Sequence, residues 1–204
     1  MVDDELIIRH VIYDLDGTLV DSALDFDRMR CEMNLPRGAP ILETLAQMPP
    51  GEAQRGWEIV ERHELRGAER AVPYPGVLEF LAALAKAHVR QAVLTRNSRI
   101  VAHTMLRLIP FPFDMVVTRD DGPVKPDPQA VWRICESWKV APGEVAIIGD
   151  SRFDMETGRR AGAWNVLYTR QREVNALPFA DQAHFHLSSF NEIERFIAWL
   201  AQPG

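Results

Sequence analysis

The sequence predicts an α/β fold in which helices cover both faces of a doubly wound parallel sheet of five strands. Three observations lead to this prediction. Short apolar runs rich in β-branched residues recur along the 204-residue chain, and helical patterns separate most of them. About fifty residues after the first run contain no convincing strand. Strands that alternate with helices are typical of parallel sheets, and the long interval predicts a small helical insert.

Five apolar runs are predicted to be buried strands because Gly, Pro or charged residues bound each of them. These runs are residues 6–13, 89–94, 115–118, 145–148 and 165–168. Helical patterns cover residues 77–88, 98–109, 128–140, 152–162 and 191–201. Ser98 and Asp127 stand where helix caps are expected. Together these elements predict a Rossmann-like core formed by residues 1–19 and 74–204.

Residues 20–73 are predicted to form a helical cap inserted after the first strand. Helix-like stretches occur at residues 24–33, 41–48 and 52–70. Proline and glycine divide them and mark the return to the core, at Pro36, Gly38, Pro40, Pro49, Pro50, Gly51, Pro73, Pro75 and Gly76. An insert that leaves the core at this point is expected to lie above whatever follows the first strand.

Composition restricts the class of protein. A net charge of -6 argues against nonspecific binding to nucleic acid or to an anionic membrane. The two cysteines, Cys31 and Cys135, are too few for a disulfide framework and fit a reducing compartment. Residues 1–5 lack the pattern of a signal peptide, and no apolar stretch reaches membrane-spanning length. We therefore expect a cytoplasmic protein.

Two carboxylates, Asp14 and Asp16, stand at the end of the first predicted strand. Side chains two residues apart in an extended segment point the same way, and Gly17 then lets the chain turn. Adjacent carboxylates repel unless a cation or a shared proton intervenes, so the pair indicates Mg²⁺ or a catalytic division of labour. A solvated turn is the plainer interpretation of this motif alone. A calcium loop of the EF-hand kind is excluded by the spacing of its Gly and Glu.

Other polar residues follow the remaining predicted strands, and parallel sheets bind ligands beyond the carboxyl ends of their strands. Taken singly, each has an ordinary structural interpretation as a helix cap or a solvated side chain. Jointly they predict one site at one edge of the sheet. The residues are Thr95, Arg96, Asn97, Lys125, Asp150 and Asp154. By contrast, His184 and His186 have no third ligand nearby and are assigned to a short surface strand near the C-terminus.

With these motifs in order from Tyr13 to Asp154, the chain resembles haloacid dehalogenase superfamily phosphohydrolases of the helical-cap kind, similar to phosphoglycolate phosphatases. The resemblance implies that Asp14 is the nucleophile that attacks phosphorus and becomes an aspartyl phosphate. It implies that Asp16 protonates the leaving oxygen and later deprotonates the attacking water. It also implies that Thr95 and Lys125 stabilise the transition state.

The same resemblance implies a Mg²⁺ site formed by the Asp14 carboxylate, the Asp16 backbone carbonyl and the Asp150 side chain. Asp154 is expected to orient metal-bound waters or Lys125. Candidate substrate contacts are Gly17, Thr18, Arg96 and Asn97. Arg96 is less usual for the family, and it is expected either to contact a carboxylate or phosphate of the substrate or to pair with an acid outside the site.

Within this resemblance, an aspartate at position 16 favours hydrolysis of a phosphate ester, because an alkoxide leaving group needs an acid that protonates it. We therefore expect a Mg²⁺-dependent phosphatase acting on a small phosphorylated metabolite, phosphoglycolate-like or sugar-phosphate-like by analogy. A phosphomutase on the same site and a phospho-acceptor signalling module are the alternatives. Four insert arginines are further candidate substrate contacts, although surface arginines are usually just solvated: Arg28, Arg30, Arg37 and Arg55. The oligomeric state is not predicted.

Overall fold

The core of the protein is a single parallel sheet, seen in a computed structural model that describes residues 6–203. Its strand order is β5-β4-β1-β6-β7-β8, and all neighbouring pairs are parallel. The first strand in sequence, β1, lies near the middle of the sheet. Strands β4 and β5 follow on one side of it and β6, β7 and β8 on the other, which confirms the doubly wound prediction. The strands are β1 (His10–Tyr13), β4 (Arg90–Leu94), β5 (Met115–Val117), β6 (Val145–Gly149), β7 (Trp164–Tyr168) and β8 (Phe185–Leu187).

The sheet has six strands, one more than predicted. The five predicted strands all form, and the short C-terminal segment expected at the surface adds β8 as an edge strand beside β7. His184 Nδ1 accepts a hydrogen bond from the backbone N–H of Asn165 at 2.9 Å, and Trp164 lies edge-on to its ring. His184 therefore helps to fix the edge strand β8 beside β7.

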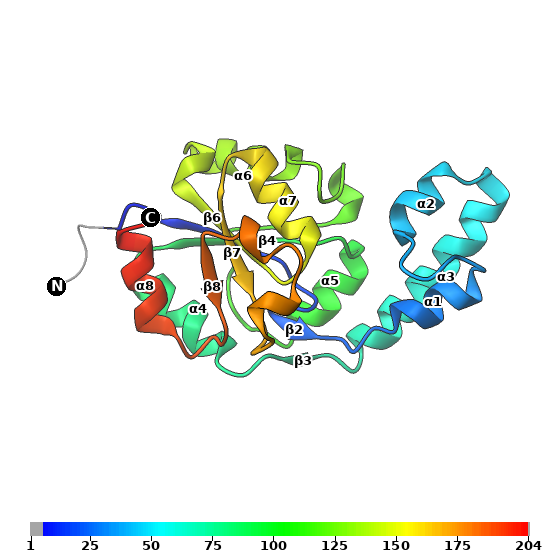
Figure 1. Ribbon diagram of the computed structural model, residues 1–204, viewed down its shortest axis with the longest axis horizontal. Helices are drawn as coiled ribbons and strands as arrows, with labels where there is room; N and C mark the ends of the chain where they lie inside the picture. Colours follow the sequence, from blue (N-terminus) through cyan, green and yellow to red (C-terminus); the bar gives the residue numbers. More distant parts are fainter. Residues whose placement is uncertain (1–5, 204) are drawn as a thin grey trace.

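Helices cover both faces of the sheet (Figure 1). On one face lie α4 (Val77–Lys86), α5 (Arg99–Leu106) and α8 (Ile193–Ala201), and on the other lie α6 (Gln129–Trp138) and α7 (Arg152–Ala161). Side chains of a strand alternate between the faces, so Tyr13 joins the first cluster and Ile12 the second. Short 3₁₀ helices occur at η1 (Arg119–Asp121), η2 (Pro142–Glu144), η3 (Val174–Ala176) and η4 (Ala180–Gln182).

The insert contains three helices, as predicted: α1 (Phe26–Glu32), α2 (Ile41–Gln47) and α3 (Pro50–Ala68). They lie to one side of the sheet in Figure 1, joined to it by the antiparallel pair β2 (Val20–Asp21) and β3 (Val72–Pro73). The helices enclose an apolar cluster of their own, built on Met29, Ile41, Leu45 and Val60. α3 also packs against α5, so the insert contacts the core away from its linker as well.

A buried ion pair joins the insert to the core. Arg119 Nη1, on η1, lies 2.7 and 2.8 Å from the two carboxylate oxygens of Glu64 on α3, and the guanidinium lies over the ring of Trp57. The side chains are only 11% and 8% exposed. Burial raises the pKa of Glu64 above its usual value although Arg119 opposes the shift. Glu64 therefore depends on Arg119 for its charge compensation.

We expect the Arg119→Met substitution to lower the free energy of unfolding by about 3 kcal/mol, because it leaves the Glu64 carboxylate buried without its cation. Replacing both residues, Arg119→Met with Glu64→Leu, is expected to recover most of that loss. Urea denaturation of both variants measures the difference. A cost below about 1 kcal/mol for the single variant, the value typical of exposed pairs, would contradict this prediction.

The sequence predicted neither a signal peptide at the N-terminus nor a membrane-spanning segment. Residues 1–5, which were expected to lack a signal peptide, lie outside the described residues. Between residues 6 and 203, no helix is both long and apolar enough to cross a membrane.

Candidate active site

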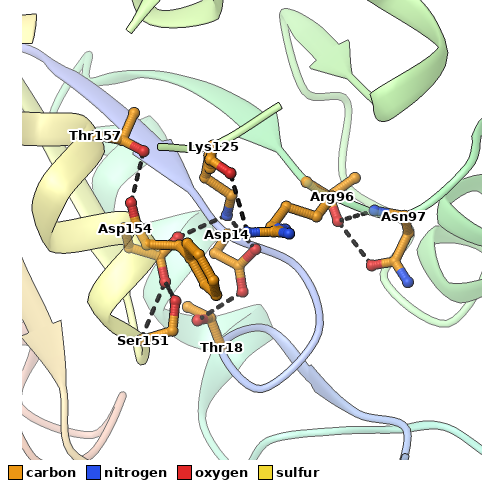
Figure 2. A network of polar contacts seen from close by, with 10 residues as sticks. Asp14, Thr18, Arg96, Asn97, Lys125, Ser151, Asp154 and Thr157 are labelled. Atoms are coloured by element: carbon orange, nitrogen blue, oxygen red, sulfur yellow. Dashed lines mark hydrogen bonds and ion pairs between the residues drawn. The ribbon is translucent and has the colours of Figure 1, made fainter. Parts of the chain in front are cut away.

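The predicted site residues meet at the carboxyl edge of the sheet. Asp14 directly follows β1, Thr95 follows β4 and Asp150 follows β6. Lys125 reaches the same edge from the loop after η1 (Figure 2). Asp14 and Asp150, more than a hundred residues apart in sequence, converge here because the neighbouring parallel strands β1 and β6 end side by side.

The turn after β1 places Asp14 and leaves no room for a side chain at Gly17. Gly17 has a φ of +87°, and a Cβ there would lie 2.8 Å from Asp150 Oδ1. Both the backbone conformation and the close approach therefore favour glycine. Thr18 is fully buried, and its hydroxyl donates to Asp14 Oδ2 at 3.2 Å. The turn thus fixes Asp14 and brings Asp150 next to it.

Lys125 lies between two carboxylates. Its Nζ is 2.5 Å from Asp14 Oδ1 and 2.6 Å from Asp154 Oδ1, and the residue is 2% exposed. Burial by itself lowers the pKa of Lys125, because it disfavours the charged ammonium. The nearby carboxylates of Asp14 and Asp154 outweigh this effect and raise the pKa above its usual value. Asp154 Oδ2 in turn accepts hydrogen bonds from the backbone and the hydroxyl of Ser151 at the start of α7. Lys125 is therefore a fixed cation beside Asp14.

The carboxylate of Asp16 is hydrogen-bonded to Ser22 and not to Lys125. The Ser22 hydroxyl lies 2.6 Å from both carboxylate oxygens of Asp16, and its backbone N–H donates to Oδ1. Burial raises the pKa of Asp16, although the Ser22 hydrogen bonds oppose the shift. A carboxyl group whose pKa is raised holds a proton more readily, which suits an acid.

Thr95 and Asn97 are buried and hydrogen-bonded to each other. The Arg96 side chain extends toward Asp14 and Lys125 (Figure 2) and also reaches Glu43 of the insert. Thr95 Oγ1 donates to Asn97 Oδ1 at 2.7 Å. Arg96 donates to Glu43 on α2 at 2.8 Å and to the backbone oxygen of Lys125, and it stacks on the ring of Phe153 at 3.9 Å. Arg96 is therefore paired with an acid, and its expected contact with a carboxylate or phosphate of the substrate stays a prediction.

Three carboxylates form a group with the chemistry of a metal site. Oxygen atoms of Asp14, Asp150 and Asp154 all lie within 4.8 Å of one another. Burial raises the pKa of Asp14 to about 7 and that of Asp150 to about 8, and the neighbouring carboxylates contribute to both shifts. Such a set offers only hard oxygen donors, so it fits Mg²⁺, although Lys125 and an arginine beside Asp150 already offset part of its negative charge. The side chain of Asp16 is not part of this group.

A cavity of about 510 Å³ opens between the sheet edge and the insert. Asp14, Asp16, Lys125 and Asp150 line it from the core, and helices α1, α2 and α3 line it from the other side. The volume lies within the roughly 300–1,000 Å³ of small-molecule sites. Of the four candidate arginines of the insert, Arg30 lines the cavity.

The model of a protein family described as haloacid dehalogenase-like hydrolase matches residues 32–167, which is more than half of the chain. The chain belongs to the haloacid dehalogenase-like hydrolase family. The predicted resemblance is thereby confirmed. The predicted enzyme class, a hydrolase of phosphoric monoester bonds, is confirmed by this match together with relatives named as phosphatases.

Relatives of this haloacid dehalogenase-like hydrolase include named phosphatases. A haloacid dehalogenase-like hydrolase domain-containing protein of Arabidopsis thaliana is 27% identical over 93% of this chain and 84% of its own length. The phosphoglycolate phosphatase of Pseudomonas savastanoi pv. phaseolicola is 33% identical over 74% of this chain and 66% of its own. A crystal structure of a hydrolase from Pseudomonas syringae has a TM-score of 0.77 at 22% identity, covering 93% of this chain and 98% of that one, which shows the fold.

Sequence reasoning missed several residues at the site of this hydrolase. Arg170, two residues after the end of β7, pairs with Asp150 Oδ2 at 2.9 Å and donates to the Tyr74 hydroxyl at 3.1 Å. The strand-end rule that found Asp14 and Asp150 would have found Arg170 had it been applied to β7. Ser22, by contrast, carries no sequence signal, because its contact with Asp16 depends on how the insert leaves the core. Phe153 contacts Arg96 through the packing of α7 beside the loop after β4, which a local pattern does not contain.

Proposed function

We propose that this hydrolase is a Mg²⁺-dependent phosphatase that cleaves a small phosphate monoester through an aspartyl phosphate on Asp14. The observation that carries the proposal is the position of Asp14. Its carboxylate lines the cavity, is paired with the buried Lys125, and lies beside the carboxylates of Asp150 and Asp154. Relatives named phosphoglycolate phosphatase support a small phosphorylated metabolite as the substrate. Residues 20–73 would act as the cap over this site.

The proposed reaction has two steps, each with a role for this chain's own residues. In the first, a carboxylate oxygen of Asp14 forms a bond to phosphorus while the ester oxygen leaves and takes a proton from Asp16. In the second, water attacks the phosphorus of the aspartyl phosphate and Asp16 accepts a proton from that water. The bond between phosphorus and the Asp14 oxygen breaks, which releases inorganic phosphate and restores the Asp14 carboxylate. Protonated Asp16 is supported by the burial that raises its pKa.

Lys125 and Thr95 would stabilise the phosphoryl group. The ammonium of Lys125 offsets negative charge on Asp14 and on the phosphoryl oxygens, and it costs no reorganisation because Asp154 already holds it. Gly17, Thr18 and Asn97 would position the phosphoryl group at the same edge, and Asp154 would orient Lys125.

Asp14, Asp150 and the backbone carbonyl of Asp16 would hold Mg²⁺, with Asp154 beside them. When bound, this ion supplies positive charge that lets an anionic carboxylate approach an anionic phosphate. Two cysteines without a disulfide, Cys31 and Cys135, support a reducing compartment, and we include a cytoplasmic location in the proposal.

The test is phosphate release from a panel of phosphate monoesters with Mg²⁺ and with a chelator. We expect release to fall on the order of a hundredfold or more when the metal is removed and to return when Mg²⁺ is added back. Release that is equal with and without the chelator would contradict the metal dependence. Absence of release from every ester, with phosphoryl transfer to a second sugar phosphate, would instead favour a phosphomutase.

A further inference from the structure

The cavity has two chemically different halves. The core half carries the carboxylates and further polar side chains, whereas the insert half is mainly apolar. The polar core side chains are Arg96, Asn97, Lys125, Ser151, Arg152 and Arg170. The apolar lining comes from Leu24, Phe26, Met29, Ile41, Leu42 and Val60. Phe26, at the start of α1, is 49% exposed, which is unusual for a ring of this size. The insert therefore presents an apolar surface across the cavity from Asp14.

Polar side chains of the insert that line the cavity already have partners. Asp21 accepts from the backbone N–H of Ala23, and Ser22 donates to Asp16. Arg30 donates to Asp27 and to the backbone oxygen of Ala39, and Glu64 is paired with Arg119.

A substrate hydroxyl placed against this half would meet mainly apolar side chains and would exchange its hydrogen bonds to water for few in the protein. Leaving a polar group unpaired in a cavity is costly, whereas burying apolar surface there is favourable. The insert half therefore discriminates against polyhydroxylated groups.

We infer that the substrate is a phosphate monoester whose alcohol part is apolar, such as an alkyl or similar hydrocarbon chain, and that the insert half binds this part. The inference rests on the proposed phosphatase function, since it places the phosphoryl group at Asp14 and the alcohol against the insert. The continuity of the two halves in one cavity supports this orientation. Sugar phosphates and glycerol phosphates would be poorer substrates.

The experiment measures kcat/KM for ethyl, butyl and hexyl phosphate, with glycerol 3-phosphate and glucose 6-phosphate for comparison. The three alkyl esters share nearly the same leaving-group chemistry and differ in apolar length. We expect kcat/KM to rise about three- to fourfold for each added methylene that the cavity buries. We expect both polyol phosphates to fall below butyl phosphate. A flat alkyl series, or a preference for the polyol phosphates, would overturn the inference and leave phosphatase activity standing.

Binding of ethyl- and hexylphosphonate, measured by calorimetry with Mg²⁺ present, separates this inference from the proposed function. These compounds have no hydrolysable ester, so their affinities do not depend on turnover. If no ester is hydrolysed but hexylphosphonate binds more tightly, the apolar half is supported and the phosphatase proposal fails. If the two phosphonates bind equally, the inference is wrong.

The Phe26→Ser variant tests the lining directly. The ring is half exposed, so its removal is expected to leave the protein folded. We expect the preference for hexyl over ethyl phosphate to fall at least threefold. Ile100→Ser is the matched control, since Ile100 is 62% exposed on α5 and does not line the cavity. An unchanged preference in Phe26→Ser, or an equal loss in Ile100→Ser, would contradict the assigned role of the insert half.

Discussion

Replacing Asp14 with asparagine is expected to reduce phosphate release by about four orders of magnitude or more. The amide has nearly the shape of the carboxylate but is not a nucleophile, so the aspartyl phosphate would not form. An acid quench of the wild-type reaction is expected to trap a phosphorylated protein that is absent in Asp14→Asn. Trapped phosphate in the variant would assign the nucleophile to another residue.

Folding of Asp14→Asn must be shown separately. Lys125 keeps Asp154 as a carboxylate partner in this variant, and the amide oxygen of asparagine can still accept a hydrogen bond from Lys125. We therefore expect the thermal midpoint to stay within about 4 °C of the wild type. The exposed Asp181, away from the cavity, gives the matched control: Asp181→Asn is expected to retain full activity.

Replacing Lys125 with methionine is expected to lower both activity and stability. Activity is expected to fall on the order of a thousandfold, because the ammonium that faces Asp14 and the phosphoryl group is lost. The free energy of unfolding measured in chelator is expected to fall by about 3 kcal/mol, because Asp14 and Asp154 lose the buried cation that lies between them. Urea denaturation and phosphate release measure the two effects.

The exposed Lys86 at the end of α4 provides the control for Lys125. Lys86→Met removes the same charge from the surface and is expected to change neither property by more than experimental error. Saturating Mg²⁺ is expected to restore part of the stability of Lys125→Met, since it supplies positive charge to the same carboxylates. Stability equal to the wild type in chelator would show that the carboxylates do not depend on Lys125.

The fold was predictable because its strands are short, apolar and bounded by turn-forming residues. The strands that end at Tyr13 and Leu94 were found within a few residues of their observed bounds. The edge strand β8 was expected only as a surface strand, because its three residues carry no signal of the partner they pair with. Pairing of strands depends on tertiary packing, which a local pattern does not contain.

The position of Asp14 relative to Asp150 was predictable from one geometric rule, that neighbouring parallel strands end together. The partners of Arg96 and Arg119 were not predictable. Many carboxylates along the chain could pair with either arginine, and Glu43 and Glu64 are selected only by where the insert packs. Long-range ion pairs are therefore set by the tertiary fold, whereas the strand-end residues follow from local sequence.

The hydrogen bond between Ser22 and Asp16 has a mechanical consequence. Ser22 is the first residue after β2, one of the two strands that link the insert to the core. A rotation of the three helices about this linker would carry Ser22 with it and stretch its contact with Asp16. The hydroxyl favours the ionised form of Asp16, so such a rotation would leave the carboxyl group more readily protonated. The linker of the insert and the proton affinity of the proposed acid are thus connected by a single side chain.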